Sequence, residues 1–128
     1  MRKVGGRMIR GIRGATTVTE NTETQILTNT KALVEDMVAK NNITAETISH
    51  VFISVTKEIN AAFPAKSLRQ IPDWTYVPVM CMTEIDVPNS LSHCIRVMMA
   101  VNTTTKQDKI QHVFHNKAIK LRLDLIQK

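Results

Sequence analysis

The 128-residue chain is poor in aromatic residues and has no long apolar run, and each shortage excludes a class of protein. Only 4% of its residues are Phe, Trp or Tyr, and its lysines and arginines form no block. Proteins that bind nucleic acids usually combine a basic surface with aromatic rings for stacking. No apolar segment is long enough to span a bilayer. The sequence therefore predicts neither a nucleic-acid-binding nor a membrane protein.

The chain also contains only two cysteines. Cys81 and Cys94 lack the spacing of a CxxC motif or of a disulfide framework, which is typical of free thiols in a reducing compartment. The first seven residues, MRKVGGR, are basic, but no apolar segment follows them as it would in a secretory signal. We expect a cytoplasmic protein in which residues 1–7 are an N-terminal extension, 8–115 the core domain and 116–128 a loosely ordered, partly mobile tail.

Sequence motifs of several enzyme classes are also missing. There is no GxSxG, no glycine-rich phosphate loop and no Cys/His nucleophile arrangement. His112 and His115 form an HxxH pair, but on a strand two side chains three residues apart point to opposite faces. We therefore expect no zinc site at this pair. We expect Met98 and Met99 to fill the core, and the seven methionines do not indicate a metal site.

Hydrophobic periodicity predicts an α+β fold with one long helix. Apolar residues recur at helical spacing from about residue 21 to 40, and Asn21 or Thr22 can cap the start. Proline at position 78 places the third strand at an edge or a bulge. One helix can cover only one face of a sheet, so we expect a second copy of the chain to cover the other. We expect strands over residues 8–18, 50–56, 75–82, 94–101 and 111–115, a helical turn at 44–47 and a short helical piece at 61–71.

Arg96 interrupts the apolar run CIRVMMAV, residues 94–101, a pattern that predicts a buried strand. A guanidinium keeps its charge inside a protein, so a buried Arg96 needs a carboxylate, a set of carbonyl groups or an anionic ligand. An internal ion pair with Glu84 is one interpretation, and a role in ligand binding is the other.

Further cations favour the ligand role of this arginine. Arg13 lies between glycines in a predicted strand, and Lys66 and Arg69 lie on one side of a short helix, all without obvious partners. Taken alone, Arg13 suits an edge strand and Cys81 suits the core. Several cations and one acid together predict a pocket for a small polyanion.

Five segments carry a specific resemblance. They are MIRGIRGATTV, AAFPAKSLRQI, WTYVPVMCMTEIDV, HCIRVMM and QHVFHNKAIKLRLDL, and they closely resemble the monofunctional barrel-type chorismate mutases in order and spacing, from about Met8 to Leu125. The resemblance implies a mixed five-stranded sheet with one long helix and short helical segments. It also implies a homotrimer, packed as a pseudo-α/β barrel, with active sites between neighbouring subunits.

The reaction that the resemblance implies is the rearrangement of chorismate to prephenate, a step in the biosynthesis of phenylalanine and tyrosine. This rearrangement proceeds within one molecule and needs no cofactor, no metal and no covalent intermediate. The missing nucleophile motifs agree with it.

Residue roles follow from the same resemblance. In the transition state the breaking ether bond of the dianionic substrate leaves partial negative charge on oxygen, and Arg96 would donate to it. Glu84 would accept from the ring hydroxyl, and Arg13 would bind a carboxylate. The remaining implied substrate-binding residues are Cys81, Met82 and Thr83 on the hydroxyl side, Phe63, Ala65, Val79 and Leu121 as an apolar wall, and Lys66, Arg69 and Arg122 as cations at the rim.

Two positions depart from the family pattern. Phe114 stands where the family has a tyrosine whose hydroxyl helps to hold a carboxylate, so we expect a raised KM rather than an inactive protein. Met80 is the second departure, and we expect it to contribute mainly its backbone.

Two other functions stay open. One is a trimeric imine-deaminase-like enzyme of similar architecture, although the other motifs of that family are missing. The second is a non-enzymatic basic module that binds RNA or an acidic partner; the pI of about 9.6 favours it, and the scarcity of aromatic residues argues against it. The formal net charge is +6, but residues 1–7 carry three of these charges, so the core is only mildly basic.

Overall fold

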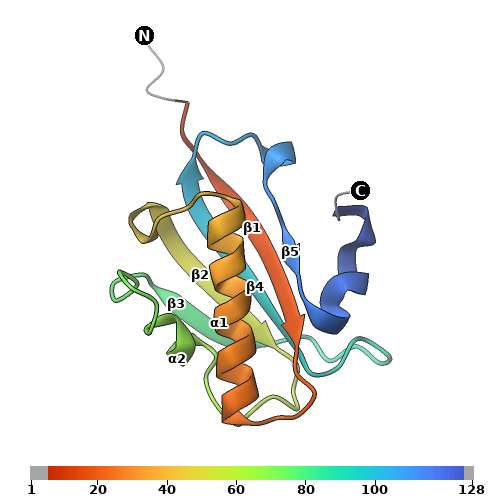
Figure 1. Cartoon of the computed structure of the whole chain (residues 1–128). Coiled ribbons are helices and arrows are strands. Elements are labelled where there is room, and N and C mark those ends of the chain that lie inside the picture. Colours follow the sequence, from red (N-terminus) through yellow and green to blue (C-terminus); the bar gives the residue numbers. More distant parts are fainter. Residues whose placement is uncertain (1–5, 126–128) are drawn as a thin grey trace.

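A computed structural model describes residues 6–125, which form a five-stranded sheet with a long helix on one face (Figure 1). The strand order is β3-β2-β4-β1-β5. The strands are β1 (Met8–Thr17), β2 (Ile48–Val55), β3 (Val79–Thr83), β4 (Cys94–Thr103) and β5 (Val113–Phe114). Strand β4 is antiparallel to β1 and β2, whereas β3 is parallel to β2 and β5 is parallel to β1. The expected α+β fold with a mixed sheet is confirmed; most of the expected N-terminal extension and the last three residues of the tail lie outside the described residues.

Helix α1 (Glu23–Lys40) begins where the sequence predicted a cap. The backbone N–H of Gln25 donates to Thr22 Oγ1 at 3.2 Å, which satisfies one of the free amide groups of the first turn. The buried face of α1 packs on the sheet through side chains that include Leu33 and Met37. Gly14 makes this close approach possible, because a Cβ atom there would lie 2.3 Å from Met37 Sδ.

Short helices complete the chain. They are a 3-10 turn η1 (Ala45–Thr47), the helix α2 (Ala65–Leu68) after Pro64, and two further 3-10 helices, η2 (Gln107–Lys109) and η3 (Asn116–Leu125). The turn at 44–47 and the short helix within 61–71 agree with the expectation. Residues 116–125 of the expected tail form η3, which contacts β1 and has Ala118 buried.

Two strands are shorter than the sequence indicated. The third strand begins only at Val79, because Trp74 is buried and the chain turns there, with the Val77 amide donating to the Trp74 carbonyl at 3.1 Å. This strand lies at the sheet edge, as Pro78 predicted. Strand β5 has only two residues. The neighbouring amide of β1, that of Arg13, donates to the side chain of His112, so the backbone ladder does not continue to residue 112.

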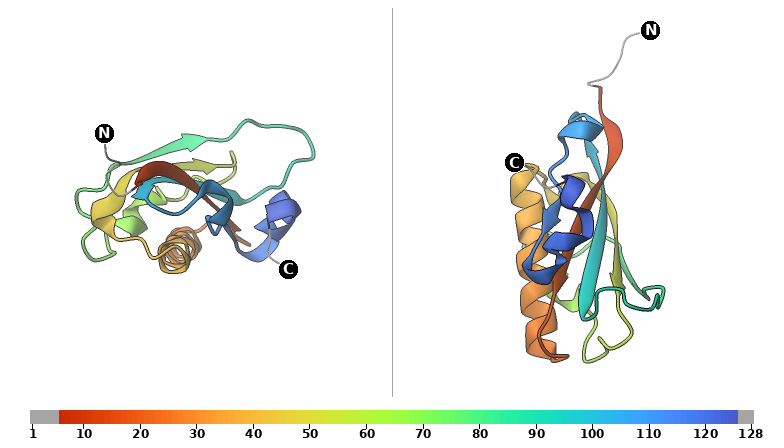
Figure 2. Two further views of the ribbon diagram at one scale, coloured as in Figure 1. Left: turned by 90° about the horizontal axis from the view of Figure 1, so that it is seen from above. Right: turned by 90° about the vertical axis from the view of Figure 1, so that its right-hand side faces the viewer.

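The two faces of the sheet differ in their cover. Both views in Figure 2 place α1 on one face, and no helix of the described chain lies over the opposite face. We call this opposite side the open face. Phe52, Met80, Met82 and Met98 lie on it with 42%, 60%, 41% and 42% of their surface exposed. These neighbouring side chains form the second apolar face that the sequence predicted.

Strand β5 is fastened to α1 by a polar pair. His115 Nε2 lies 2.8 Å from Asp36 Oδ2, and because an ionised carboxylate only accepts, the ring nitrogen is the donor. The His115 hydrogen bond holds the pKa of Asp36 below its usual value, against burial and with help from Lys40 at 3.5 Å. A lowered carboxyl pKa stabilises the fold above the unfolded-state pKa, and this contribution is lost as the pH falls through the folded-state pKa.

We expect Asp36→Asn to lower the free energy of unfolding by about 1 kcal/mol at pH 7, since it weakens a charge-assisted hydrogen bond that is partly solvent-exposed. The difference from wild type should shrink as the pH is lowered through the depressed pKa of Asp36. Urea unfolding at fixed protein concentration across this pH range measures it. Asp108→Asn, at an exposed carboxylate, serves as the control, and a difference that does not vary with pH would contradict the assignment.

Candidate active site

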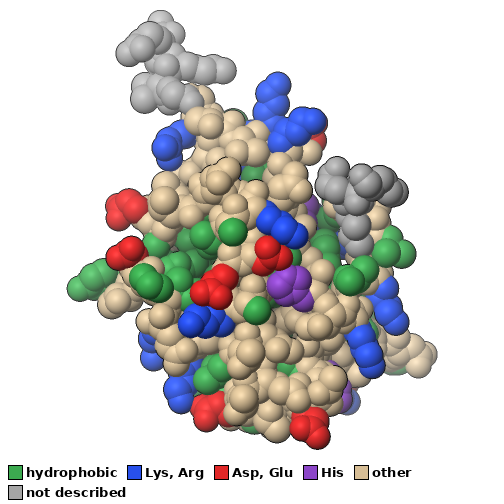
Figure 3. Space-filling view, in the orientation of Figure 1, with side chains coloured by type: hydrophobic (Ala, Val, Ile, Leu, Met, Phe, Trp, Pro, Cys, Tyr) green, Lys and Arg blue, Asp and Glu red, His purple; other side chains and the backbone are tan. Residues whose placement is uncertain are grey.

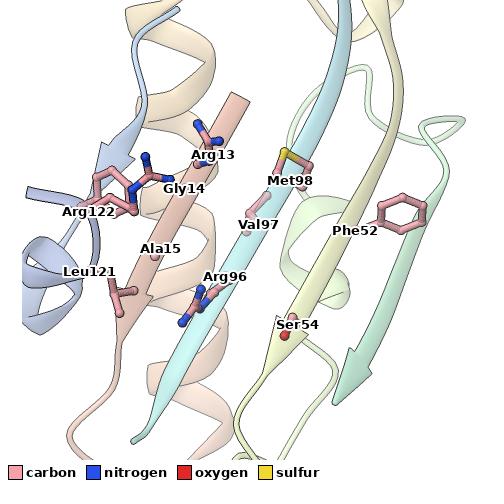
Figure 4. A pocket seen from close by; sticks show the side chains of 11 residues that line it. Arg13, Gly14, Ala15, Phe52, Ser54, Arg96, Val97, Met98, Leu121 and Arg122 are labelled. Carbon is pink, nitrogen blue, oxygen red and sulfur yellow. The ribbon is translucent and has the colours of Figure 1, made fainter. Parts of the chain in front are cut away.

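A cavity of about 220 Å³ opens on the open face at the junction of β1, β4, β5 and η3 (Figure 4). Three arginines from three elements surround it: Arg13 of β1, Arg96 of β4 and Arg122 of η3. The pleat puts Arg13 and Arg96 on one face, since each is in register with an open-face neighbour, Met98 and Ala15 respectively. The other lining residues are Gly14, Ala15, Phe52, Ser54, Val97, Met98, Phe114 and Leu121.

Arg96 and Glu84 form an ion pair at the edge of this cavity. Arg96 Nε lies 3.2 Å from Glu84 Oε2, and the amide of Glu84 donates to the carbonyl of Val55 at 2.8 Å, which fixes the acid just past the end of β3. The pairing of Arg96 with Glu84 is therefore present, although it is not an internal ion pair, and it is compatible with a ligand role of Arg96. Burial was predicted wrongly for the single chain, because the Arg96 side chain is 50% exposed on the open face. Since the pair uses Nε, the two terminal nitrogens are left for other acceptors.

Arg13 is not on a sheet edge. Strand β1 lies between β4 and β5, so a role of this charge in blocking strand addition is wrong. The backbone N–H of Arg13 donates to His112 Nδ1 at 2.9 Å, and Arg13 Nη1 lies 3.3 Å from His112 Nε2. Burial is the main cause that lowers the pKa of His112, and the charges of Arg13 and Arg122 add to it. A neutral ring suits the acceptor role of Nδ1.

A second hollow, of about 460 Å³, has no charged residue in its lining and lies beside β3 and the loop before α2. Cys81, Met82 and Thr83 line it from β3, and Phe63 lines it with 75% of its surface exposed. The structure therefore divides the expected site residues. Within residues 6–125, the cationic cavity holds Arg13, Arg96, Phe114, Leu121 and Arg122, and the apolar hollow holds Phe63, Cys81, Met82 and Thr83.

The remaining expected residues lie outside both lining sets. Val79 and Met80 are on β3, whereas Ala65, Lys66 and Arg69 are on or directly after α2. Lys66 does have a partner, since its Nζ lies 2.9 Å from Glu23 Oε2 at the start of α1. The expectation of an unpaired Lys66 is therefore wrong.

Sequence reasoning missed three residues near the arginines. Phe52 and Ser54 of β2 line the cationic cavity, and Ser54 is in register with Arg96. The hydroxyl of Ser54 is buried without a hydrogen-bond partner among the described residues. The alternation in HVFISV could have placed both residues on one face. The third residue is His112, which the sequence presents only as half of an HxxH pair. The two histidines of that pair contact different partners, His112 the backbone of Arg13 and His115 the carboxylate of Asp36.

Other kinds of site find little support in the part of the chain that is described. Residues 6–125 contain no group of three or more His, Cys, Asp and Glu side chains that could hold a metal ion, and none of their helices is long and apolar enough to cross a membrane. On the α1 face, acidic and basic side chains are interspersed rather than gathered by sign (Figure 3). A broad basic surface, as the nucleic-acid module would need, is absent from this face.

Known proteins match over nearly the whole chain. The sequence model of the chorismate mutase type I family matches residues 9–125. The chain is 49% identical to chorismate mutase AroH of Bacillus subtilis, over 92% of this chain and 93% of that protein. It is 42% identical to chorismate mutase AroH of Thermus thermophilus, over 92% and 97%.

A solved structure supports the same assignment. A chorismate mutase from Clostridium thermocellum superposes with a TM-score of 0.82 at 47% identity, covering 84% of this chain and 96% of that one. These matches favour neither the imine-deaminase-like enzyme nor the basic binding module. The chain belongs to the type I chorismate mutases, the family and enzyme class that its sequence predicted.

Proposed function

We propose that the chain rearranges chorismate to prephenate, and that two neighbouring copies of it complete each active site. The observation that carries this proposal is the ring of Arg13, Arg96 and Arg122 around one cavity of a chain from this family. Chorismate carries two carboxylates, so three convergent guanidinium groups match its charge.

Arg96 performs the central step. As the ether bond breaks, negative charge grows on the ether oxygen, and a fixed cationic donor stabilises this transition state more than the substrate. Glu84 holds Arg96 through Nε at 3.2 Å, so the terminal nitrogens can point to the oxygen without prior rearrangement. The carboxylate of Glu84 accepts from the ring hydroxyl in this proposal and stabilises the positive charge that develops on the ring.

Arg13 and Arg122 bind the carboxylates. Holding both ends of the dianion favours the compact conformer in which the bond-forming carbons meet, and this orientation lowers the entropic part of the barrier. Phe114 and Leu121 supply apolar contacts in the same cavity. No residue needs to act as a nucleophile.

The site is completed between subunits of a homotrimer. The cationic cavity of about 220 Å³ is smaller than the 300 Å³ or more that is usual for ligand pockets, and it opens onto the exposed apolar side chains of the open face. Contact with a neighbour would cover these side chains and bring its apolar hollow, lined by Phe63 and Cys81, against the arginines. Lys66 and Arg69 of that neighbour then lie at the rim, where they attract the dianion.

The direct test is the loss of chorismate absorbance on addition of the purified protein. Acceleration over buffer that saturates with substrate supports the proposal, and a rate equal to that of buffer ends it. Light scattering should give three times the mass of the chain. The expected cytoplasmic location remains part of this proposal and agrees with the free thiols of Cys81 and Cys94.

We expect Phe114→Tyr to lower KM by about threefold to tenfold, because it restores a hydroxyl that can donate to a substrate carboxylate. The turnover number should change less, since this hydrogen bond is present in both the substrate complex and the transition state. Steady-state kinetics measure both constants. Tyr76→Phe, which removes the hydroxyl of a residue that is 94% exposed, is the control. A lower kcat at unchanged KM would contradict the carboxylate role of this position.

A further inference from the structure

His112 lies beside Arg13 and has no role in the reaction proposed above. Its Nδ1 accepts the backbone N–H of Arg13 at 2.9 Å, so this nitrogen carries the lone pair. A neutral imidazole has one donor and one acceptor, and the proton therefore lies on Nε2. The strand backbone fixes both the tautomer and the orientation of the ring.

The Nε2–H group faces another donor. Nε2 lies 3.3 Å from Arg13 Nη1, and two N–H groups cannot hydrogen-bond to each other. One oxygen atom at ordinary hydrogen-bond distance can, however, accept from both nitrogens at this separation. The charges that act on the ring are those of Arg13 and Arg122. The Asp124 carboxylate, which also feels the charge of Arg13, is paired with Arg122 at 2.8 Å. An anionic oxygen is the acceptor that this pair of donors lacks.

The sequence around β5 suggests a role for this pair of donors in substrate binding. Phe114, two residues after His112, lines the cavity together with Arg13, and it has no hydroxyl to offer a carboxylate. We propose that His112 Nε2–H and Arg13 Nη1 form a paired donor site for one carboxylate oxygen of the substrate, a role that the hydroxyl at position 114 does not fill in this chain. The proposal rests on the function proposed above.

The lowered pKa of His112 agrees with this arrangement. A ring that stays neutral near pH 7 keeps Nδ1 available for the amide of Arg13 and Nε2–H available for the ligand. Protonation would remove the acceptor and detach the ring from β1.

The decisive variant is His112→Asn. The amide oxygen can still accept from the Arg13 backbone, but the donor at the Nε2 position is gone. We expect KM to rise about tenfold, with kcat within about twofold of wild type. In a Phe114→Tyr background the same substitution should raise KM by less than about threefold, because the tyrosine hydroxyl replaces the lost donor. His93→Asn, at a half-buried histidine outside the site with a left-handed backbone that asparagine accepts, should leave both constants unchanged.

A second measurement does not depend on turnover. The ¹⁵N signals of the His112 ring in the wild-type protein should show the Nε2–H tautomer, and the Nε2–H signal should shift on titration with malonate or prephenate. A KM within twofold of wild type for His112→Asn, or a ring protonated at Nδ1, would overturn the proposal, as would a signal that saturating prephenate leaves unchanged. If wild type does not convert chorismate, the reaction assignment fails, while the malonate titration still decides whether the anion site exists.

Discussion

Arg96→Lys will lower kcat about 10²- to 10³-fold, and Arg96→Ala by at least as much, with a smaller change in KM. The reason is that negative charge on the ether oxygen exists only in the transition state, so a donor aimed at it acts mainly on kcat. Lysine keeps the charge but cannot bind Glu84 through Nε and still present two terminal donors. Single-turnover and steady-state rates of chorismate loss measure the effect.

Arg10 offers a matched control on the same sheet. Its guanidinium contacts the carbonyl of Thr105 and the side chain of Gln107, away from the cavity, so Arg10→Lys should keep the wild-type rate. Circular dichroism and light scattering should show the same fold and mass for all variants. Near-wild-type turnover in Arg96→Lys would remove Arg96 from the central role and would leave the ion pair with Glu84 as its only function.

The pattern of the sequence predicted the fold where local signals are strong. Helix α1 has its cap at Thr22 and its apolar periodicity, and strand β4 follows the run CIRVMMAV. Prediction was weaker where tertiary contacts decide the structure. The Trp74 turn shortens the third strand because burial of the indole outweighs the strand preference of Thr75, Tyr76 and Val77.

The candidate site was predicted as a set of residues but not as an arrangement. The apolar surroundings of Arg96 suggested its pairing with Glu84, and the resemblance placed both residues in one site with Arg13. The surroundings of these cations depend on residues far away in the sequence, however. Lys66 pairs with Glu23, 43 residues away, and the backbone N–H of Arg13 donates to His112, 99 residues away. No local pattern encodes these contacts.

The exposure of Arg96 has a similar origin. Its neighbours Ile95 and Val97 are buried in the core, so an apolar run suggested burial of the whole strand. A strand with one face on the core and the other toward a second subunit has the same apolar pattern as a strand buried within one chain. The sequence therefore predicted a burial of Arg96 that the single chain lacks and that the proposed assembly would provide.

Subunit mixing provides the sharpest test of that assembly. Arg96→Ala removes the cationic half of a site, and Phe63→Glu places a carboxylate in the apolar half, where it repels the dianionic substrate. Phe63 is 75% exposed in the single chain, so this change should not disturb the core. Each variant alone should be nearly inactive. If every site takes its arginines from one subunit and its apolar wall from the next, equal co-refolding of the two variants restores about one quarter of the sites.

The recovered activity should follow the product of the two subunit fractions and should reach its maximum at equal amounts. Double-variant subunits mixed with either single variant are the control, because no arrangement of those chains unites an intact arginine set with an intact wall. Sites built within one subunit would behave differently: mixing could not restore any of them, and the rate would stay at the level of the inactive parents at every ratio. Recovery in the co-refolded sample therefore separates a site between subunits from a site within one chain, independently of the trimer mass.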